Sequence, residues 1–236
     1  MAAPTPIYAC LIAPTAPPWV VRAARTIGSS LARRGWTLRT GASGPGEAAV
    51  EQGHREVSQS RLFVHLPWRR FNAHASPYCI VPDEALALAR SLIPNPDRAP
   101  VSQIKLIGAM MQAVLGDRLD RPCDFVVAWT PDGAYVGDAG AALTLVLNRG
   151  LPNVNLARLP AGAAVGRTLA AAAAALEPPV EVEAVPRFEV RGGDGNAAAR
   201  ADPRARATPG RPAAPATVPR PERPALPPPS RLLPPR

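Results

Sequence analysis

The chain has 236 residues, a formal net charge of +9 and 31 prolines, and only 5% of its residues are aromatic. Its three cysteines, Cys10, Cys79 and Cys123, are widely spaced and form no C-x-x-C pair, which excludes a disulfide framework or a zinc site as the basis of the fold. No stretch approaches the roughly 20 apolar residues that span a bilayer, and the N-terminus lacks the basic segment of a signal peptide. We therefore expect a cytoplasmic protein with no membrane partner.

Short apolar runs alternate with helical patterns along residues 1–178. We expect strands at residues 7–13, 36–39, 61–66, 123–129 and 154–159. Helical patterns cover residues 17–34, 46–57, 83–91, 101–115, 140–149 and 162–176. Because parallel neighbours need crossover connections, this alternation predicts an α/β fold: a doubly wound, mainly parallel five-stranded Rossmann-like sheet with helices on both faces.

The composition changes after residue 178. Residues 179–195 alternate weakly and are interpreted as a connector that could add an edge strand. Residues 196–236 hold 12 prolines and eight arginines against two acids, so +6 of the net charge of +9 lies there. This composition predicts a disordered, partly polyproline II tail. Its arginines are explained by a GC-rich genome, by contact with nucleic acid, or by docking of a protein partner.

A loop rich in small residues follows the second expected strand and precedes a helix. The candidate phosphate-binding residues in it are Thr40, Gly41, Ser43, Gly44, Gly46 and Glu47. Glycines allow the backbone to approach a phosphate at a helix N-terminus, although they also serve an ordinary tight turn. Glu47 is expected to cap the helix dipole, or alternatively to accept hydrogen bonds from ribose hydroxyls.

Two further loops leave expected strand ends. The second holds the densest cationic and aromatic cluster of the chain: Trp68, Arg69, Arg70, Phe71, Asn72 and His74. Rings beside arginines suit stacking on bases and contact with phosphates, but Trp68 and Phe71 could instead pin the loop to the core. The third loop offers Thr130, Asp132, Gly137, Asp138 and Gly140 as ligand contacts. Ligands of such sheets bind at the carboxyl ends of the strands, so the three loops are expected to share one cleft.

The residues do not identify a catalytic or metal site. No nucleophile and base can be paired from the sequence, and the three histidines lack metal-ligand spacing. We therefore assign no catalytic residue, no metal ligand and no cofactor.

Four segments together resemble a known family. They are the loop and helix start at residues 40–47, the Leu-Pro-Trp and Phe-Asn pairs within residues 66–72, the strand and loop at 124–133 with the helix start at 137–142, and residues 150–156. Their order and spacing over residues 7–160 resemble those of DprA-like proteins of the SMF/LOG superfamily, particularly the short versions found in phages.

The resemblance implies a domain that binds nucleotides or single-stranded DNA, whose larger relatives load a recombinase in DNA processing and recombination. It further implies a recombinase or another protein as partner through the tail, assembly into homo-oligomers, and location in a host cytoplasm if a phage encodes the chain. The family's S-G-G-A-x-G-A-D segment falls on residues 40–47, where Ala42, Pro45 and Glu47 replace two glycines and an aspartate. The family's G-S-R is absent from residues 13–15.

Three functions remain open on these residues. The first is nucleotide or single-stranded DNA binding without catalysis. The second is cleavage of a small nucleotide, with Glu47 and either Asp132 or Asp138 as acid and base, although the hydrolase motif P-G-G-x-G-T-x-x-E of that superfamily is missing. The third is a degenerate domain that serves as an interaction scaffold through its proline-rich tail.

Overall fold

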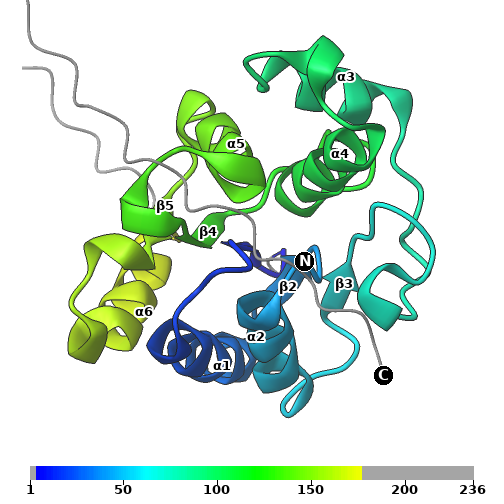
Figure 1. Cartoon of the computed structure of the whole chain (residues 1–236). Helices are drawn as coiled ribbons and strands as arrows, with labels where there is room; N and C mark the ends of the chain where they lie inside the picture. The colour runs from blue at the N-terminus through cyan, green and yellow to red at the C-terminus, as the bar shows by residue number, and fades with distance from the viewer. Residues whose placement is uncertain (1–3, 177–236) are drawn as a thin grey trace, which may run out of the picture. The chain divides into compact units, whose positions relative to one another are not determined.

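A computed structural model describes residues 4–176 of the chain. Its five strands form one parallel sheet in the order β3-β2-β1-β4-β5 (Figure 1). The strands are β1 (Ile7–Ile12), β2 (Thr37–Thr40), β3 (Leu62–Val64), β4 (Phe125–Trp129) and β5 (Asn153–Asn155). The predicted fold class, a doubly wound Rossmann-like sheet, is confirmed.

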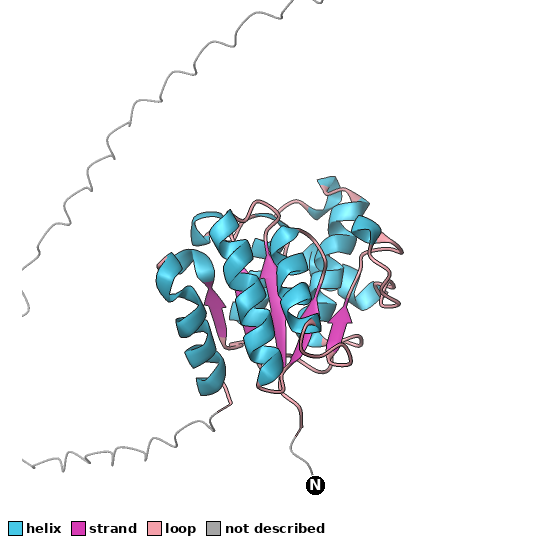
Figure 2. Cartoon of the chain, turned by 90° about the horizontal axis from the view of Figure 1, so that it is seen from below, coloured by secondary structure: helices cyan, strands magenta, loops and turns pink. Residues whose placement is uncertain are grey.

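Six helices cover the two faces of this sheet. One face packs against α1 (Pro18–Arg33), α2 (Pro45–Arg55) and α6 (Ala164–Ala174). The other face packs against α4 (Val101–Leu115) and α5 (Gly137–Asn148), and α3 (Asp83–Ser91) packs on α4. Figure 2 views the sheet through the first group, with the strand arrows running side by side behind the helices.

The central position of β1 in the sheet explains why its sequence is apolar throughout. All six of its residues are buried. Tyr8, Cys10 and Ile12 face the core beneath α1 and α2, whereas Ile7, Ala9 and Leu11 face the core beneath α4 and α5. A strand covered on both faces has no polar side, so the continuous apolar run was the correct signal for a central parallel strand.

Helices α1 and α2 lie unusually close together because each presents a glycine to the other. A Cβ atom on Gly28 would lie 2.2 Å from the Val50 carbonyl oxygen, and one on Gly53 would lie 2.0 Å from the Arg25 carbonyl oxygen. The backbones of the two helices are therefore in direct contact. This contact fixes α2, whose first turn belongs to the first candidate loop.

Four expected strands are shorter than the sequence indicated: the first ends at Ile12 and the fourth begins at Phe125. The fifth, expected to continue to residue 159, ends at Asn155, because the Asn155 side chain accepts a hydrogen bond from the Ala157 amide (3.1 Å) and starts a 3₁₀ turn. The third ends at Val64: the His65 amide still donates to the Thr40 carbonyl (2.8 Å), and the next amide, that of Leu66, faces away from β2 and donates to the Tyr78 carbonyl (2.7 Å).

The predicted connector at 179–195 and the predicted tail at 196–236 lie outside the described residues. Between residues 4 and 176, no helix is both long enough and apolar enough to cross a membrane.

Candidate functional site

A cavity of about 280 Å³ opens at the carboxyl end of the sheet where the strand order reverses. Strands β2 and β3 lie on one side of β1, and β4 and β5 lie on the other, which makes the gap between β1 and β4 the switch point of the fold. The cavity is lined by residues that follow β1, β2 and β4 and by two residues of α4: Ala13, Pro14, Thr15, Ser43, Leu106, Met110, Pro131, Val136, Gly137, Asp138 and Ala139. We call it the switch-point cavity.

The start of α5 forms one wall of this cavity. Gly137, Asp138 and Ala139 line it, and no side chain caps the helix N-terminus. The backbone amides of this first turn are therefore available to an anionic group. The Asp138 carboxylate accepts a hydrogen bond from the Gln103 side chain (2.9 Å), which ties α5 to the start of α4.

The opposite wall holds only one residue of the first loop, Ser43. The Ser43 amide donates to the carboxylate of Glu47 (2.7 Å), and the Ile12 amide donates to the other oxygen of the same carboxylate (3.3 Å). Glu47 is completely buried. Burial raises the pKa of Glu47 to about 7, opposed by hydrogen bonds from Ser43, Ile12 and Gly41. This carboxylate thus joins the end of β1 to the first loop and occupies an amide that we expected a phosphate to use.

Close packing accounts for two of the glycines in this loop. A Cβ atom on Gly44 would lie 2.8 Å from Cα of Pro14, and one on Gly46 would lie 2.3 Å from Cγ2 of Ile12. Gly140 in the third loop is similar, because a Cβ there would lie 2.5 Å from the Tyr135 carbonyl carbon. These glycines bring protein backbone against protein, which is the structural alternative to close approach of a ligand.

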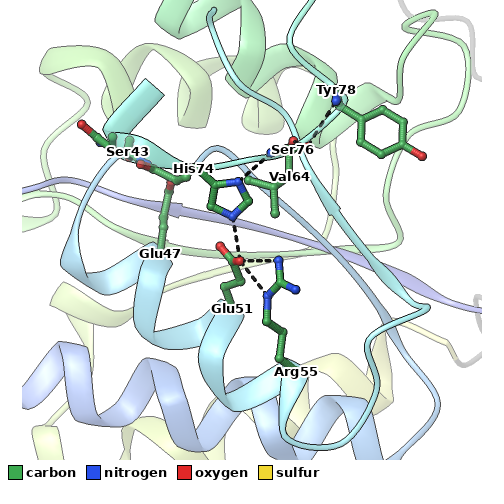
Figure 3. Close-up of polar contacts among 10 residues, drawn as sticks. Ser43, Glu47, Glu51, Arg55, Val64, His74, Ser76 and Tyr78 are labelled. Carbon is green, nitrogen blue, oxygen red and sulfur yellow. Dashed lines mark hydrogen bonds and ion pairs between the residues drawn. The ribbon is translucent and has the colours of Figure 1, made fainter. Parts of the chain in front are cut away.

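The second loop lies against the first loop but does not line the cavity. Asn72 donates from its side chain to the Ala42 carbonyl (2.9 Å). His74 donates from Nε2 to Glu51 (2.8 Å), and its Nδ1 accepts from the Ser76 amide (3.1 Å). Figure 3 shows His74 held between Glu51 on α2 and Ser76, with Arg55 on the far side of the same carboxylate.

The cationic and aromatic residues of this loop divide into two groups. Phe71 packs against the small apolar cluster beneath the loop and so anchors it. Trp68 is 39% exposed and meets the Phe71 ring edge to face at 5.0 Å, while Arg69 and Arg70 are exposed. Phe71 thus anchors the loop, as one of the two alternatives expected, while Trp68, Arg69 and Arg70 remain accessible to solvent.

Backbone strain is concentrated in the three loops. Six non-glycine residues of the described part have positive φ, and five of them are in these loops: Ala42, Arg70, Asn72, Ala73 and Asp132. Such conformations cost free energy and collect at sites where geometry matters for function. The strain marks this edge of the sheet on grounds independent of the cavity.

Three predicted contacts of the third loop, Thr130, Asp132 and Gly140, lie outside the cavity lining. Thr130 is buried, and its hydroxyl accepts from the Asn155 side chain (2.9 Å), so it connects β4 to β5. Asp132 is exposed with φ of 54° and does not line the cavity. Within the described residues, no group of three or more His, Cys, Asp or Glu side chains could hold a metal ion.

The fold and the cavity raise the question of relatives. No protein-family model, curated protein or solved structure matches this chain. The resemblance to DprA-like proteins stays a prediction, and the site must be interpreted from its own residues.

Sequence reasoning missed several residues of this site. Glu51, which holds His74, could have been found from its position one helical turn after Glu47 on the same face of α2. Leu106 and Met110 line the cavity from α4 and carried no signal beyond an apolar helix. Only the topology of the sheet brings α4 to the switch point.

Proposed function

We propose that the chain binds a nucleotide in the switch-point cavity and extends this site to single-stranded DNA through the exposed residues Trp68, Arg69 and Arg70. The observation that carries the proposal is the position of the cavity, since ligands of doubly wound sheets bind where the strand order reverses. The resemblance to DprA-like proteins agrees with it.

The lining of the cavity suits the parts of a nucleotide. Leu106, Met110 and Val136 offer an apolar wall for a base, while Thr15 and Asp138 offer polar atoms for a sugar. The uncapped amides at the start of α5 offer a position for one phosphate. Asp138 is the only charged lining residue, so the cavity itself suits a single nucleotide better than a polyanion.

A longer strand needs cations, and these lie on the second loop, which contacts the first loop. Arg69 and Arg70 are exposed on the second loop, beside the accessible ring of Trp68. Asn72 connects this loop to Ala42, the neighbour of the cavity residue Ser43. Bases of single strands stack on such rings while arginines contact the backbone phosphates.

The geometry gives no support to nucleotide cleavage by the acids considered above. Glu47 is buried, binds backbone amides and does not line the cavity that Asp138 lines. Incubation of the protein with the four ribonucleoside monophosphates should therefore leave them intact, without a released base or ribose phosphate. Detection of either product would favour the enzymatic alternative.

Calorimetric titration of the full chain with the four ribonucleoside monophosphates tests the cavity. Thr15 is exposed at its lining, so Thr15→Phe should fill the space and weaken binding at least about tenfold. The matched control is Thr26→Phe on the exposed side of α1. Equal affinities of the two variants would contradict the position of the site.

Binding of single-stranded and double-stranded oligonucleotides at two salt concentrations tests the surface. Replacing Arg69 and Arg70 together by Gln should reduce the salt dependence of single-strand binding by about 1.4 in the slope of log K against log salt, because each lost phosphate contact contributes about 0.7. The control is the same replacement of Arg33 and Arg34, which lie at the C-terminal end of α1. Binding that is insensitive to salt, or absent for every nucleotide and oligonucleotide, would overturn the proposal.

A further inference from the structure

A second cavity of about 280 Å³ lies at the other end of α4, on the same face of the sheet. Its base is formed by Arg39 of β2 and by His65, which follows β3, and Gly116 after α4 closes it. Gln103, in the first turn of α4, contacts Asp138 at the switch-point cavity. Met110, which lines the switch-point cavity, and Gly116 are six residues apart, about 9 Å along the axis of α4, whose position Figure 1 shows. The two cavities share no lining residue.

The base of this cavity holds a buried charge that makes no direct ion pair within the described residues. Arg39 is 8% exposed, and its guanidinium donates one hydrogen bond, to the Arg121 carbonyl (2.8 Å). Within residues 4–176 no carboxylate lies within 4 Å of it as an ion-pair partner. Burial of the guanidinium lowers the pKa of Arg39. A buried charge without a partner is costly, and an oxyanion in the cavity would relieve that cost.

His65 presents a second unsatisfied group to the same space. It is 1% exposed, and neither ring nitrogen has a hydrogen-bond partner among the described residues, although Nδ1 lies 3.3 Å from a carboxylate oxygen of Asp117. Burial lowers the pKa of His65 to about 4, so the imidazole is neutral near pH 7. A neutral imidazole offers one N–H donor and one acceptor to a ligand.

The charges around the cavity indicate how much negative charge it accepts. The rim carries Asp117, Arg118, Asp120 and Arg121, all exposed, which balance one another. With His65 neutral, the lining residues carry one net positive charge, that of Arg39. The half-buried Phe63 adds an apolar wall beside these groups. The site thus matches one negative charge next to an apolar body.

The geometry points to a binding site for a small monocarboxylate, with the carboxylate on the Arg39 guanidinium, one ligand oxygen within reach of His65, and the apolar part of the ligand against Phe63. The planar fork of a guanidinium pairs with both oxygens of a carboxylate. A phosphate dianion fits less well, because its second charge would meet no net positive charge at the rim, where Asp117 and Asp120 balance Arg118 and Arg121. The volume lies at the small end of ligand sites, which excludes a dinucleotide or a flavin. This inference is independent of the proposed nucleotide site.

Imidazole nitrogen resonances of the full chain labelled with ¹⁵N test this site directly. The chain has three histidines, and His65→Gln assigns the signal of His65. Addition of benzoate, or of acetate, should shift the His65 signal and saturate in the millimolar range, while inorganic phosphate and sodium chloride at equal ionic strength should not. His54, whose Nδ1 is hydrogen-bonded to the Tyr8 hydroxyl (3.1 Å) on the other face of the sheet, serves as the internal control.

Two variants test the charge argument. Arg39→Lys keeps the charge but loses the fork, and benzoate affinity should fall at least about tenfold. Arg98→Lys, on an exposed turn outside the cavity, should leave it unchanged. Asp117→Asn removes a repulsive rim charge from an exposed position and should strengthen benzoate binding about two- to fivefold.

Asp117→Asn also keeps the test decisive if Arg39→Lys does not fold, as judged by loss of the His54 signal. Four outcomes would overturn the inference. They are no saturable shift of His65 with either carboxylate, tighter binding of phosphate than of benzoate, equal benzoate affinity in folded Arg39→Lys and the unsubstituted chain, and no gain of affinity in Asp117→Asn.

Discussion

The carboxylate of Glu47 accepts the backbone amide of Ser43 at 2.7 Å in a completely buried position. Because burial raises the pKa of Glu47 from 4.5 to about 7, the folded chain holds a proton on this group that the unfolded chain has already released. The contribution of Glu47 to stability should therefore be greatest below pH 4.5 and should be lost as the pH rises to 7.

Glu47→Gln removes this titration. Between pH 5 and pH 8 the unsubstituted chain should lose roughly 3 kcal/mol of unfolding free energy relative to the variant, as an order of magnitude for a shift of this size. Urea unfolding at intervals of one pH unit measures the difference. If the unfolding free energies of the two proteins change in parallel with pH across this range, the pKa of Glu47 is not raised. The variant should also be less stable at low pH, because an amide NH₂ cannot accept a backbone N–H.

Two glycine-to-alanine substitutions should have opposite effects on stability, because only one of the two glycines lies in the contact of α1 with α2. Gly53→Ala would bring Cβ to 2.0 Å from the Arg25 carbonyl oxygen, and the forced separation of the helices should cost about 1–3 kcal/mol. Gly166→Ala, in α6 with no atom within 4 Å of the new Cβ, should stabilise by about 0.5–1 kcal/mol. Thermal unfolding of both variants provides the comparison, and a neutral Gly53→Ala would contradict the direct backbone contact.

Removal of the His74 side chain should loosen the second loop. His74→Ala leaves Glu51 paired with Arg55 alone and deprives the Ser76 amide of its acceptor. An opening equilibrium eased by about 1 kcal/mol would raise tryptic cleavage after Arg69 and Arg70 about fivefold. Mass spectrometry of the fragments distinguishes cleavage after Arg69 and Arg70 from cleavage elsewhere in the chain. Gln52→Ala, an exposed neighbour on α2, should leave the rate unchanged, and equal rates in the two variants would argue against anchoring by His74.

Deletion of residues 196–236 should distinguish nucleic-acid binding by these residues from nucleotide binding in the cavity. The eight arginines of that segment are expected to add affinity for any nucleic acid without reading its sequence. The shortened chain should therefore bind oligonucleotides more weakly and with a smaller salt dependence, while its affinity for a mononucleotide stays the same. Mobility-shift and calorimetric measurements on both chains test this, and unchanged oligonucleotide binding would attribute the arginines to composition alone.

Much of the fold could be predicted because its signals are local. The apolar run of β1, the proline at the start of α1 and the glycines after α1 and α5 each act within one or two turns of chain. The predicted bounds of α3 and α4 agree with the structure. The end of β5 was missed because one side chain, that of Asn155, competes with the sheet for a backbone amide.

The site was less predictable because it depends on contacts that are distant in sequence. Glycines 44 and 46 look the same in sequence whether they approach a phosphate or, as here, Pro14 and Ile12. The pairing of Glu51 with His74 joins residues 23 positions apart. The unpaired charge of Arg39 becomes visible only once the loop after α4 is in place.

The anchored second loop also decides how the sheet ends. Ser76 donates its hydroxyl to the Val64 carbonyl (2.5 Å), and the Tyr78 carbonyl accepts the Leu66 amide (2.7 Å), as the upper part of Figure 3 illustrates around Ser76 and Val64. Backbone groups at the margin of β3 are thus already engaged within the chain. A second copy therefore has few free partners for strand addition at this margin of the sheet.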